Sequence, residues 1–412
     1  MSNDIPLALY FHWPYCLSKC PYCDFNSHVA ASVDHERWRK AYRAEIETLH
    51  HQFPDRVISS VFFGGGTPSL MEAHTIAQIT GDIARLWGLG DDVEVTLEAN
   101  PTSTEAAKFA DFKAAGINRV SIGVQALNDP DLKALGRHHS AAEALEAVAI
   151  ARRLFERFSF DLIYTRSGHT LKAWEAELRA ALPHADGGHM SLYQLTIEAG
   201  TQFQTLYDSG RLTIPEDDLA AQFYDLTAAV MEDAGMPAYE ISNYAKAGQE
   251  SRHNLAYWTY ADYAGIGPGA HGRLTFYGGP NAQDAQAAAA HTRIATRAHK
   301  APDIWLKTIL DVPQGSTAGA PASAPYSAFQ NPEILTPLMQ FEEMMMMGLR
   351  LRRGVDLDAV HARTGIDPKD HLNHAAIAAL CADGYITQNG TIIALTAKGM
   401  PVLNAVLRAI LL

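Results

Sequence analysis

The chain has 412 residues, of which 47% are hydrophobic and 19% charged, and its formal net charge is −13 with histidine neutral. These values are typical of a globular protein with one large α/β domain and a smaller second domain. The negative charge argues against general binding to nucleic-acid phosphates, so no nucleic-acid partner is expected. Residues 1–10 lack a signal-peptide pattern, and no apolar run is long enough to span a membrane, which predicts a cytoplasmic protein.

Short apolar runs alternate with amphipathic stretches through the first half of the chain. The strands are expected at 7–11, 57–63, 93–97, 119–124, 158–164 and 190–196, and the helices between them at 34–52, 72–86, 104–115, 141–155 and 171–182. Each strand and its helix occupy roughly 30 residues, as in βαβ units. We predict an open, partial (β/α)6 barrel in preference to a doubly wound sheet, with ligands at the carboxyl ends of the strands.

The pattern changes beyond residue 200. A helix at 216–234 is followed by a polar, aromatic and glycine-rich stretch at 239–279, and residues 311–332 are rich in Ala, Ser and Pro, which predicts a flexible loop. Further helices are expected at 336–351, 357–364 and 372–383, before a hairpin across Asn389-Gly390. This order predicts a small α+β, winged-helix-like C-terminal domain. We therefore expect three parts: residues 1–235, 236–332 and 333–412.

Three of the four cysteines, Cys16, Cys20 and Cys23, lie close together near the start of the chain. Such a group is not a disulfide framework, and iron-bound thiolates need a reducing compartment. Three thiolates can hold three irons of a four-iron cluster and leave the fourth iron open to a small ligand. Zinc is the alternative, with His12 or His28 completing the site, although zinc sites usually carry a second cysteine pair.

Polar residues recur where the predicted strands end. Three glycines, 64–66, precede Thr67-Pro68, which indicates either a tight turn or a ligand that touches bare backbone. Each of the other residues could be structural by itself, but together they converge on one barrel mouth: Glu98, Gln125, Arg137 and Asp161. Carboxylates accept hydrogen bonds from ribose hydroxyls and arginine binds a carboxylate, so the set predicts a ligand with hydroxyls and a zwitterionic end.

These motifs resemble the radical S-adenosylmethionine (SAM) superfamily, and more narrowly its oxygen-independent coproporphyrinogen III oxidase-like family. The resemblance implies a [4Fe-4S] cluster on Cys16, Cys20 and Cys23, and a SAM molecule bound to its open iron. It further implies that a reductant such as flavodoxin or ferredoxin supplies the electron that cleaves SAM. The SAM-binding residues that it implies are Tyr10, Gly65, Gly66, Thr67, Glu98, Gln125, Arg137 and Asp161.

Two subgroups of this family differ at the cluster. The oxidases carry a fourth cysteine where this chain has Phe25, whereas the heme chaperone subgroup HemW has the sequence found at residues 23–28, Cys-Asp-Phe-Asn-Ser-His. The HemW-like signature His-Asn-x-x-Tyr-Trp also occurs, beginning at His253. The resemblance thus implies a chaperone that binds heme and transfers it to acceptor proteins, such as respiratory proteins at the membrane surface. The alternative is a coproporphyrinogen III dehydrogenase, and whether SAM is cleaved in turnover, and by which catalytic residue, stays open.

His253 is the heme ligand that the signature implies, since neutral imidazole is a common axial ligand and Tyr and Trp offer flat faces to a macrocycle. Without the resemblance, a packed aromatic turn with a hydrogen-bonded histidine is the simpler interpretation. The competing ligands are His271, His138, His139 and the methionines at 344–347.

One segment departs from the family that the motifs resemble. After Tyr164 the family usually continues Gly-Leu-Pro-Gly-Gln-Thr, whereas residues 165–170 here read Thr-Arg-Ser-Gly-His-Thr. The loop has lost a glycine and a proline and gained a positive charge, so its shape beside the SAM site is expected to differ.

Overall fold

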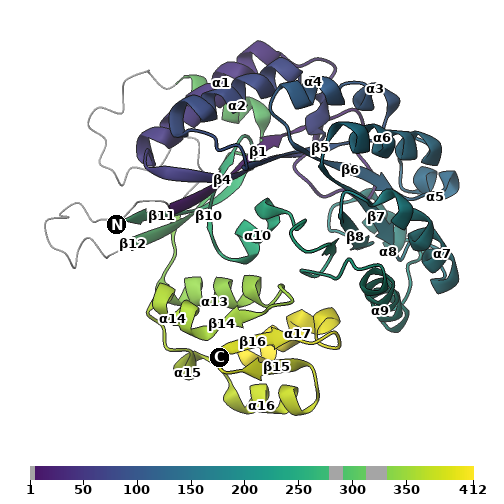
Figure 1. Ribbon diagram of the computed structural model, residues 1–412, viewed down its shortest axis with the longest axis vertical. Helices are drawn as coiled ribbons and strands as arrows, with labels where there is room; N and C mark the ends of the chain where they lie inside the picture. Colours follow the sequence, from purple (N-terminus) through teal and green to yellow (C-terminus); the bar gives the residue numbers. More distant parts are fainter. Residues whose placement is uncertain (1–4, 278–290, 312–331) are drawn as a thin grey trace, which may run out of the picture.

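The computed structural model describes residues 5–277, 291–311 and 332–412 (Figure 1). Nearly all of the predicted flexible loop, at 312–331, lies outside the described residues. A large sheet runs through the molecule, and its described strands follow the order β13-β12-β11-β10-β1-β4-β5-β6-β7-β8-β9. The two ends of this order are not paired with each other among the described strands, so the sheet is open, and it curves in Figure 1.

The prediction of six parallel strands is confirmed. They are β1 (Ile5–Trp13), β4 (Arg56–Gly65), β5 (Glu94–Ala99), β6 (Arg119–Gln125), β7 (Arg157–Tyr164) and β8 (His189–Gln194). The helices between them cover the outer face of the sheet in Figure 1: α1 (His35–Gln52), α2 (Ala73–Trp87), α3 (Ser103–Ala106), α4 (Phe109–Ala114), α5 (Asp129–Ala134), α6 (Ala141–Leu154) and α7 (Leu171–Ala181). The helix predicted at 104–115 is split into α3 and α4.

Local sequence accounts for these elements. The side chain of Asp34 caps α1 by accepting a hydrogen bond from Arg37 N at 3.0 Å, which is the cap expected for an aspartate at this position. Along the same helix Trp38, Tyr42 and Ile46 recur on one face and are buried against the sheet. Burial of this apolar face, at about 25 cal/mol per Å² of apolar surface, is the main force that holds the helix in place.

The stretch at 239–279, which lacked a clear pattern in the sequence, extends the sheet at both edges. β10 (Asp262–Ile266) pairs parallel with β1, and β11 (His271–Tyr277) continues antiparallel. Two strands from beyond this stretch, β12 (His291–Arg297) and β13 (Glu333–Ile334), extend the same edge antiparallel. β9 (Asn243–Ala245) lies at the opposite edge, beside β8. Gly265 explains part of the missed signal: a Cβ there would lie 2.2 Å from His271 O, so the strand needs glycine, which weakens its strand pattern.

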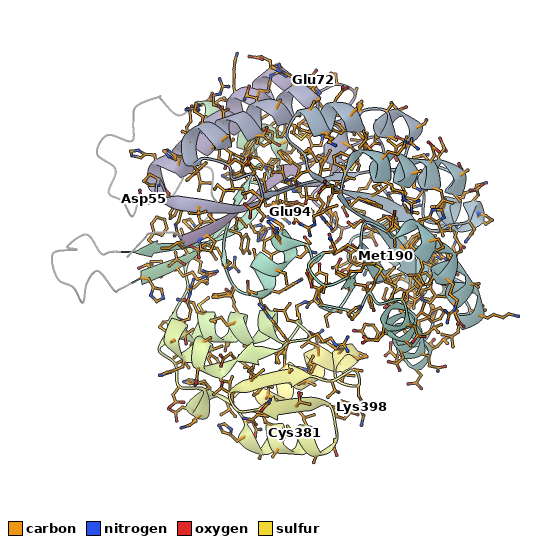
Figure 2. All side chains as sticks on the ribbon, in the orientation of Figure 1. Asp55, Glu72, Glu94, Met190, Cys381 and Lys398 are labelled. Atoms are coloured by element: carbon orange, nitrogen blue, oxygen red, sulfur yellow. The ribbon has the colours of Figure 1, made fainter. Side chains whose placement is uncertain are left out.

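The predicted helix, helix and hairpin order near the C-terminus is confirmed. Its elements are α13 (Pro337–Gly348), β14 (Val355–Asp356), α14 (Leu357–Thr364), α15 (Pro368–His371), α16 (His374–Ala382), β15 (Ile386–Asn389), β16 (Ile392–Leu395) and α17 (Leu403–Ile410). They enclose a second hydrophobic core, to which Met345 contributes a fully buried side chain. Cys381 lies on α16 in this domain and packs against its core (Figure 2).

The remaining helices and short strands lie between or beside these elements. They are β2 (Tyr15–Cys16), β3 (His28–Val29), α8 (Gln202–Asp208), α9 (Asp217–Asp233), α10 (Arg252–Trp258) and α12 (Pro302–Leu310). In Figure 1, α10 lies on the concave side of the sheet, between the sheet and the C-terminal domain. No described helix has the length and apolarity that a membrane crossing needs.

Candidate cluster and cofactor site

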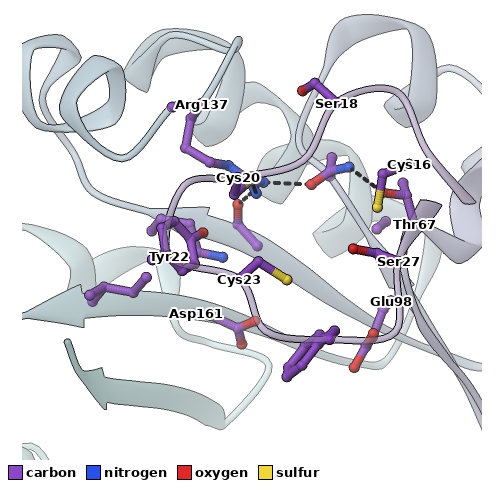
Figure 3. Close-up of a pocket in the computed structure, with 18 of the residues that line it drawn as sticks. Cys16, Ser18, Cys20, Tyr22, Cys23, Ser27, Thr67, Glu98, Arg137 and Asp161 are labelled. Atoms are coloured by element: carbon purple, nitrogen blue, oxygen red, sulfur yellow. Dashed lines mark hydrogen bonds between the residues drawn. The ribbon is translucent and has the colours of Figure 1, made fainter. Parts of the chain in front are cut away.

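The three clustered cysteines lie on the loop that follows β1. Cys16 ends β2, which pairs with β3, and Cys23 N donates to Cys20 O at 3.2 Å in a turn. All three thiols are free and partly buried. They line one cavity of about 400 Å³ at the carboxyl ends of the strands. Figure 3 shows them on one loop, with Glu98 and Asp161 reaching the cavity from the strands.

Two side chains outside the loop donate hydrogen bonds to the cysteine sulfurs. Thr67 Oγ1 donates to Cys16 Sγ at 3.4 Å, and Arg137 Nη1 donates to Cys20 Sγ at 3.5 Å. Asn100 joins these donors, because its Nδ2 donates to Thr67 Oγ1 at 3.2 Å and its Oδ1 accepts from Arg137. Donors of this kind stabilise negative charge on sulfur and tune a cluster that the sulfurs hold.

The three thiols and the hydrogen-bond donors around them suit an iron–sulfur cluster. Burial raises the pKa of the Cys16 and Cys23 thiols, so a positively charged partner is needed to hold them as thiolates. Among residues 5–277, 291–311 and 332–412, no three His, Cys, Asp or Glu side chains are grouped to hold a single metal ion. Thiolates that bind separate irons of a cluster need not meet at one point.

The glycine run is required by close contacts between β4, β1 and the cysteine loop. Gly65 has φ +114°, and a Cβ there would lie 2.6 Å from the ring of His12. A Cβ on Gly66 would lie 2.8 Å from Tyr15 O. Both glycines also line the cavity, and Gly65 N donates to Glu98 Oε2 at 3.3 Å. The tight-turn interpretation is confirmed, and the same packing leaves bare backbone at the cavity wall.

Two carboxylates face the cavity in an environment that disfavours their charge. Burial, together with the charge of Asp161, raises the pKa of Glu98 to about 8. Burial also raises the pKa of Asp161 to about 6, although hydrogen bonds from Ser191 and Ser121 oppose the rise. A cationic ligand in the cavity would relieve this cost by pairing with both groups.

The structure brings most of the predicted SAM residues together. The cavity wall includes Gly65, Gly66, Thr67, Glu98, Gln125, Arg137 and Asp161. Tyr10 lies behind this wall: its ring is next to Gly64, and its hydroxyl donates to His12 Nδ1 at 3.1 Å. Asn100, Ser121, Tyr22 and Tyr193 also line the cavity and were not predicted. Asn100 alone had a signal, because it follows Glu98 at the end of a predicted strand.

His253 lies outside this cavity, at the base of the barrel. Its side chain is 1% exposed and stacks on Phe62, with ring centroids 4.9 Å apart. Ser60 Oγ lies 2.9 Å from its Nδ1, and Tyr257 Oη lies 2.7 Å from its Nε2. Burial and the charge of Arg119 lower the pKa of His253 to about 3, so the ring is neutral. Both ring nitrogens are hydrogen-bonded, so ligation of iron by Nε2 requires Tyr257 to move.

The competing heme ligands differ in access. His271 is exposed on β11, and His138 is exposed at the cavity, where its Nε2 lies 2.8 Å from Ser18 Oγ. His139 is buried, and its Nε2 bonds to Val124 O at 3.0 Å. Phe25, which stands where the oxidases have a fourth cysteine, is 60% exposed at the rim of the cavity.

Family profiles and a solved structure resemble this chain in sequence and in fold. The radical SAM superfamily profile matches residues 10–181, and the profile of the HemN C-terminal domain matches residues 335–402. The structure of coproporphyrinogen III oxidase (HemN) from Escherichia coli, described as a radical SAM enzyme, has a TM-score of 0.77 and 18% identity. The similarity covers 98% of this chain and 90% of HemN, and it shows that the two proteins share a fold.

Curated relatives narrow the assignment. The heme chaperone HemW of Mycobacterium tuberculosis is 33% identical over 413 residues, which cover 98% of this chain and 95% of the relative. That of Haemophilus influenzae is 42% identical over 66% of this chain and 71% of the relative. The mitochondrial radical S-adenosyl methionine domain-containing protein 1 of Bos taurus is 41% identical, and the match covers 84% of this chain and 74% of the relative. The chain belongs to the radical SAM superfamily, and within its HemN-like proteins it belongs to the HemW subgroup.

Proposed function

We propose that this protein is a heme chaperone, which binds heme and passes it to acceptor proteins, built on a SAM-binding [4Fe-4S] scaffold. The observation that carries the proposal is the similarity to heme chaperones over nearly the whole chain, together with three free thiols in one cavity. Delivery to respiratory proteins at a membrane surface, by a protein that otherwise resides in the cytoplasm, is part of the same proposal.

The cavity residues have distinct proposed roles. Cys16, Cys20 and Cys23 hold the cluster, and a bound cluster with SAM would supply one-electron chemistry when reduced by a flavodoxin or ferredoxin. Arg137 and Thr67 donate to the cysteine sulfurs and keep the loop in place. Gly65 and Gly66 leave room for the methionine end of SAM. The carboxylates of Glu98 and Asp161, with Gln125, bind its cationic and ribose parts, and Tyr10 supports the wall from behind.

His253 is the proposed heme ligand, and the structure sets a condition on this role. Ligation needs the Tyr257 hydroxyl to release Nε2, because that nitrogen is bonded at 2.7 Å. Tyr257→Phe should therefore bind heme more tightly than wild type if His253 is the ligand, whereas His253→Ala should bind it weakly. Equal affinities in the three proteins would exclude His253 and direct attention to His138 and His271.

Titration with hemin after anaerobic cluster reconstitution tests the proposal. A Soret shift that saturates near one heme per chain is expected. No shift at stoichiometric heme would rule out the heme chaperone function. The alternative function is oxidative decarboxylation of coproporphyrinogen III, which the HemN fold supports. Its test is formation of vinyl product with SAM and a reductant, and we expect none, because Phe25 replaces the fourth cysteine.

A further inference from the structure

The loop after β7 is built around a buried arginine. The side chain of Arg166 is 4% exposed and binds both carboxylate oxygens of Glu177 on α7, with Nη1 to Oε1 at 3.2 Å. Its Nη2 also lies 3.0 Å from Asp131 Oδ2 and 3.1 Å from His169 Nε2. A two-pronged contact between a guanidinium and a carboxylate fixes the orientation of both groups. Arg166 and Glu177 therefore form a rigid pair.

This pair also binds the backbone that immediately follows the Gln125 side chain in sequence. Arg166 Nη1 donates to Gln125 O at 3.5 Å, and Glu177 Oε1 accepts from Leu127 N at 2.7 Å. Gln125 has φ +72°, in the left-handed region that residues other than glycine rarely adopt. Such a conformation persists only where the surroundings enforce it. The two peptide groups that follow Gln125 are each held by one member of the pair.

The rest of the loop supports the same wall of the cavity. Burial and the charge of Arg166 lower the pKa of His169 to about 4, so His169 is neutral and its Nε2 accepts from Arg166. Thr165 also has a left-handed backbone, with φ +57°, and its hydroxyl accepts from Leu195 N at 3.0 Å. Gln125 and Leu195 both line the cavity. The loop thus links the ends of β6 and β8.

We propose that Arg166 and Glu177 are positioning residues that hold Gln125 in the shape the SAM cavity requires. The inference rests on the proposed binding of SAM in this cavity. Without the pair, Gln125 can relax to an extended backbone, which takes its side chain out of the cavity wall. SAM would then bind only the fraction of molecules that keep the strained conformation, and its apparent dissociation constant would rise by the inverse of that fraction.

The test is a paired substitution, Arg166→Met with Glu177→Met, which removes both charges and leaves neither buried alone. The reconstituted protein is titrated anaerobically with SAM, and the dissociation constant is measured by calorimetry and from the change in the electron paramagnetic resonance spectrum of the reduced cluster. We expect a dissociation constant raised on the order of tenfold, with the wild-type spectrum at saturating SAM.

Arg293→Met is the control for loss of a buried arginine elsewhere in the protein. Arg293 is fully buried and pairs with Asp262, as Arg166 pairs with Glu177, but it lies on β12 and does not line the cavity. It should lower the melting temperature and leave the dissociation constant of SAM unchanged. Glu177→Gln, which keeps the side-chain volume, is a second variant in case the double variant does not fold, and it should also weaken SAM binding.

The outcomes separate the two proposals. Variants that lower the melting temperature but bind SAM as tightly as wild type would overturn the positioning role alone. Wild type that binds no SAM would overturn the proposed cofactor site and this inference with it. Weaker SAM binding in both Arg166/Glu177 variants, with normal binding in Arg293→Met, would support the inference.

Discussion

At the scale of single residues, Glu98 and Asp161 have the most strongly perturbed carboxyl groups of the cavity wall. They enter from β5 and β7, and the surrounding protein raises the pKa of each above its ordinary value. The hydrogen bonds that reach these carboxylates come from neutral donors, Gly65 N to Glu98 Oε2 and Ser121 Oγ to Asp161 Oδ1. Ionising these groups therefore costs free energy, and a positively charged ligand in the cavity would offset that cost.

The first prediction concerns the pH dependence of SAM binding. The sulfonium of SAM favours the ionised carboxylates, so affinity should rise as pH rises through the pKa values of about 6 for Asp161 and about 8 for Glu98. The cofactor-free protein should behave oppositely. Between pH 4.5, the ordinary pKa of Glu98, and about 8, its folded state binds more protons than the unfolded chain, so its stability should fall as pH rises.

Calorimetry with SAM across this pH range, and urea unfolding of the cofactor-free protein, measure the two trends. Glu98→Gln should remove most of the dependence above pH 7, because the amide does not titrate. If Glu98→Gln keeps the wild-type pH profile, another group controls it.

The second prediction separates two costs of replacing a glycine: the left-handed backbone conformation and the steric clash of an added Cβ. Gly65→Ala meets both a left-handed backbone and a Cβ contact of 2.6 Å with His12, whereas Gly200→Ala has φ +76° with no atom within 4 Å. Gly200→Ala should lower the free energy of unfolding by about 1 kcal/mol, and Gly65→Ala by about 3 kcal/mol or more. Urea unfolding measures both. Equal losses would mean that the loop moves to accommodate the Cβ.

At the scale of elements, the cysteine loop is separate from the main hydrophobic core. Among the described residues, none of its three cysteines belongs to the buried core clusters, and β2 and β3, which frame the loop, have two residues each. The three thiols therefore add little to apolar packing, and the loop is also held by other residues: Tyr22 packs against Phe203, and Asn26 Nδ2 donates to Pro268 O and Lys300 O.

The third prediction follows from this separation. Replacing Cys16, Cys20 and Cys23 together by serine should abolish iron binding and change the unfolding free energy of the cluster-free protein by less than about 1 kcal/mol. Iron and sulfide analysis and urea unfolding are the measurements. Cys381→Ser is the control, and it should retain the iron of the wild type. Unfolding of the triple variant would show that the thiols have a structural role.

Helix α10 is the element whose role the sequence described least well. Ser251 caps it, and Glu94 on β5 accepts from His253 N at 3.3 Å. The helix therefore packs against the concave side of the sheet, and its histidine, tyrosine and tryptophan are tied into aromatic contacts. In the sequence, the same residues suggested either a heme ligand beside flat aromatic faces or a packed aromatic turn with a hydrogen-bonded histidine.

At the scale of the whole molecule, the C-terminal domain is joined to the barrel by polar contacts of unequal burial. Glu343 on α13 accepts from Tyr260 Oη at 2.6 Å and pairs with Arg273 at 2.7 Å, with a carboxylate 18% exposed. Arg352 pairs with Glu232 on α9 at the same distance, but both of these side chains are more than half exposed. The two contacts bridge the same two bodies.

The fourth prediction uses this difference. Glu343→Ala should lower the free energy of unfolding by about 1 to 3 kcal/mol, because it leaves a partly buried arginine and a tyrosine hydroxyl unpaired. Glu232→Ala should cost about 0 to 1 kcal/mol, since an exposed pair is screened by water. Thermal unfolding by calorimetry compares them. A similar loss in both variants would show that the interface is more open to water than the structure indicates.

The sequence by itself determined the six parallel strands, the helices between them, the helical C-terminal domain and the group of seven residues at the cavity wall. Strand patterns and helix caps are local, and parallel strands bring their carboxyl ends to one edge. It also predicted the cysteine loop as the site of a cluster, a prediction that iron analysis will test.

Only the tertiary structure decided where the remaining side chains face. Tyr10 lies behind the wall because β1 packs its ring against Gly64. His253 has both ring nitrogens bonded because α10 packs on the sheet, where Ser60 meets Nδ1, and because Tyr257 of the same helix meets Nε2. In the sequence, Arg166 appears only as an added positive charge in the loop after Tyr164. In the structure it is buried beside Glu177 and donates a hydrogen bond to Gln125 O. Gly64, Ser60 and Gln125 are far in sequence from Tyr10, His253 and Arg166, respectively, so these contacts depend on the packing of distant elements and have no local signal.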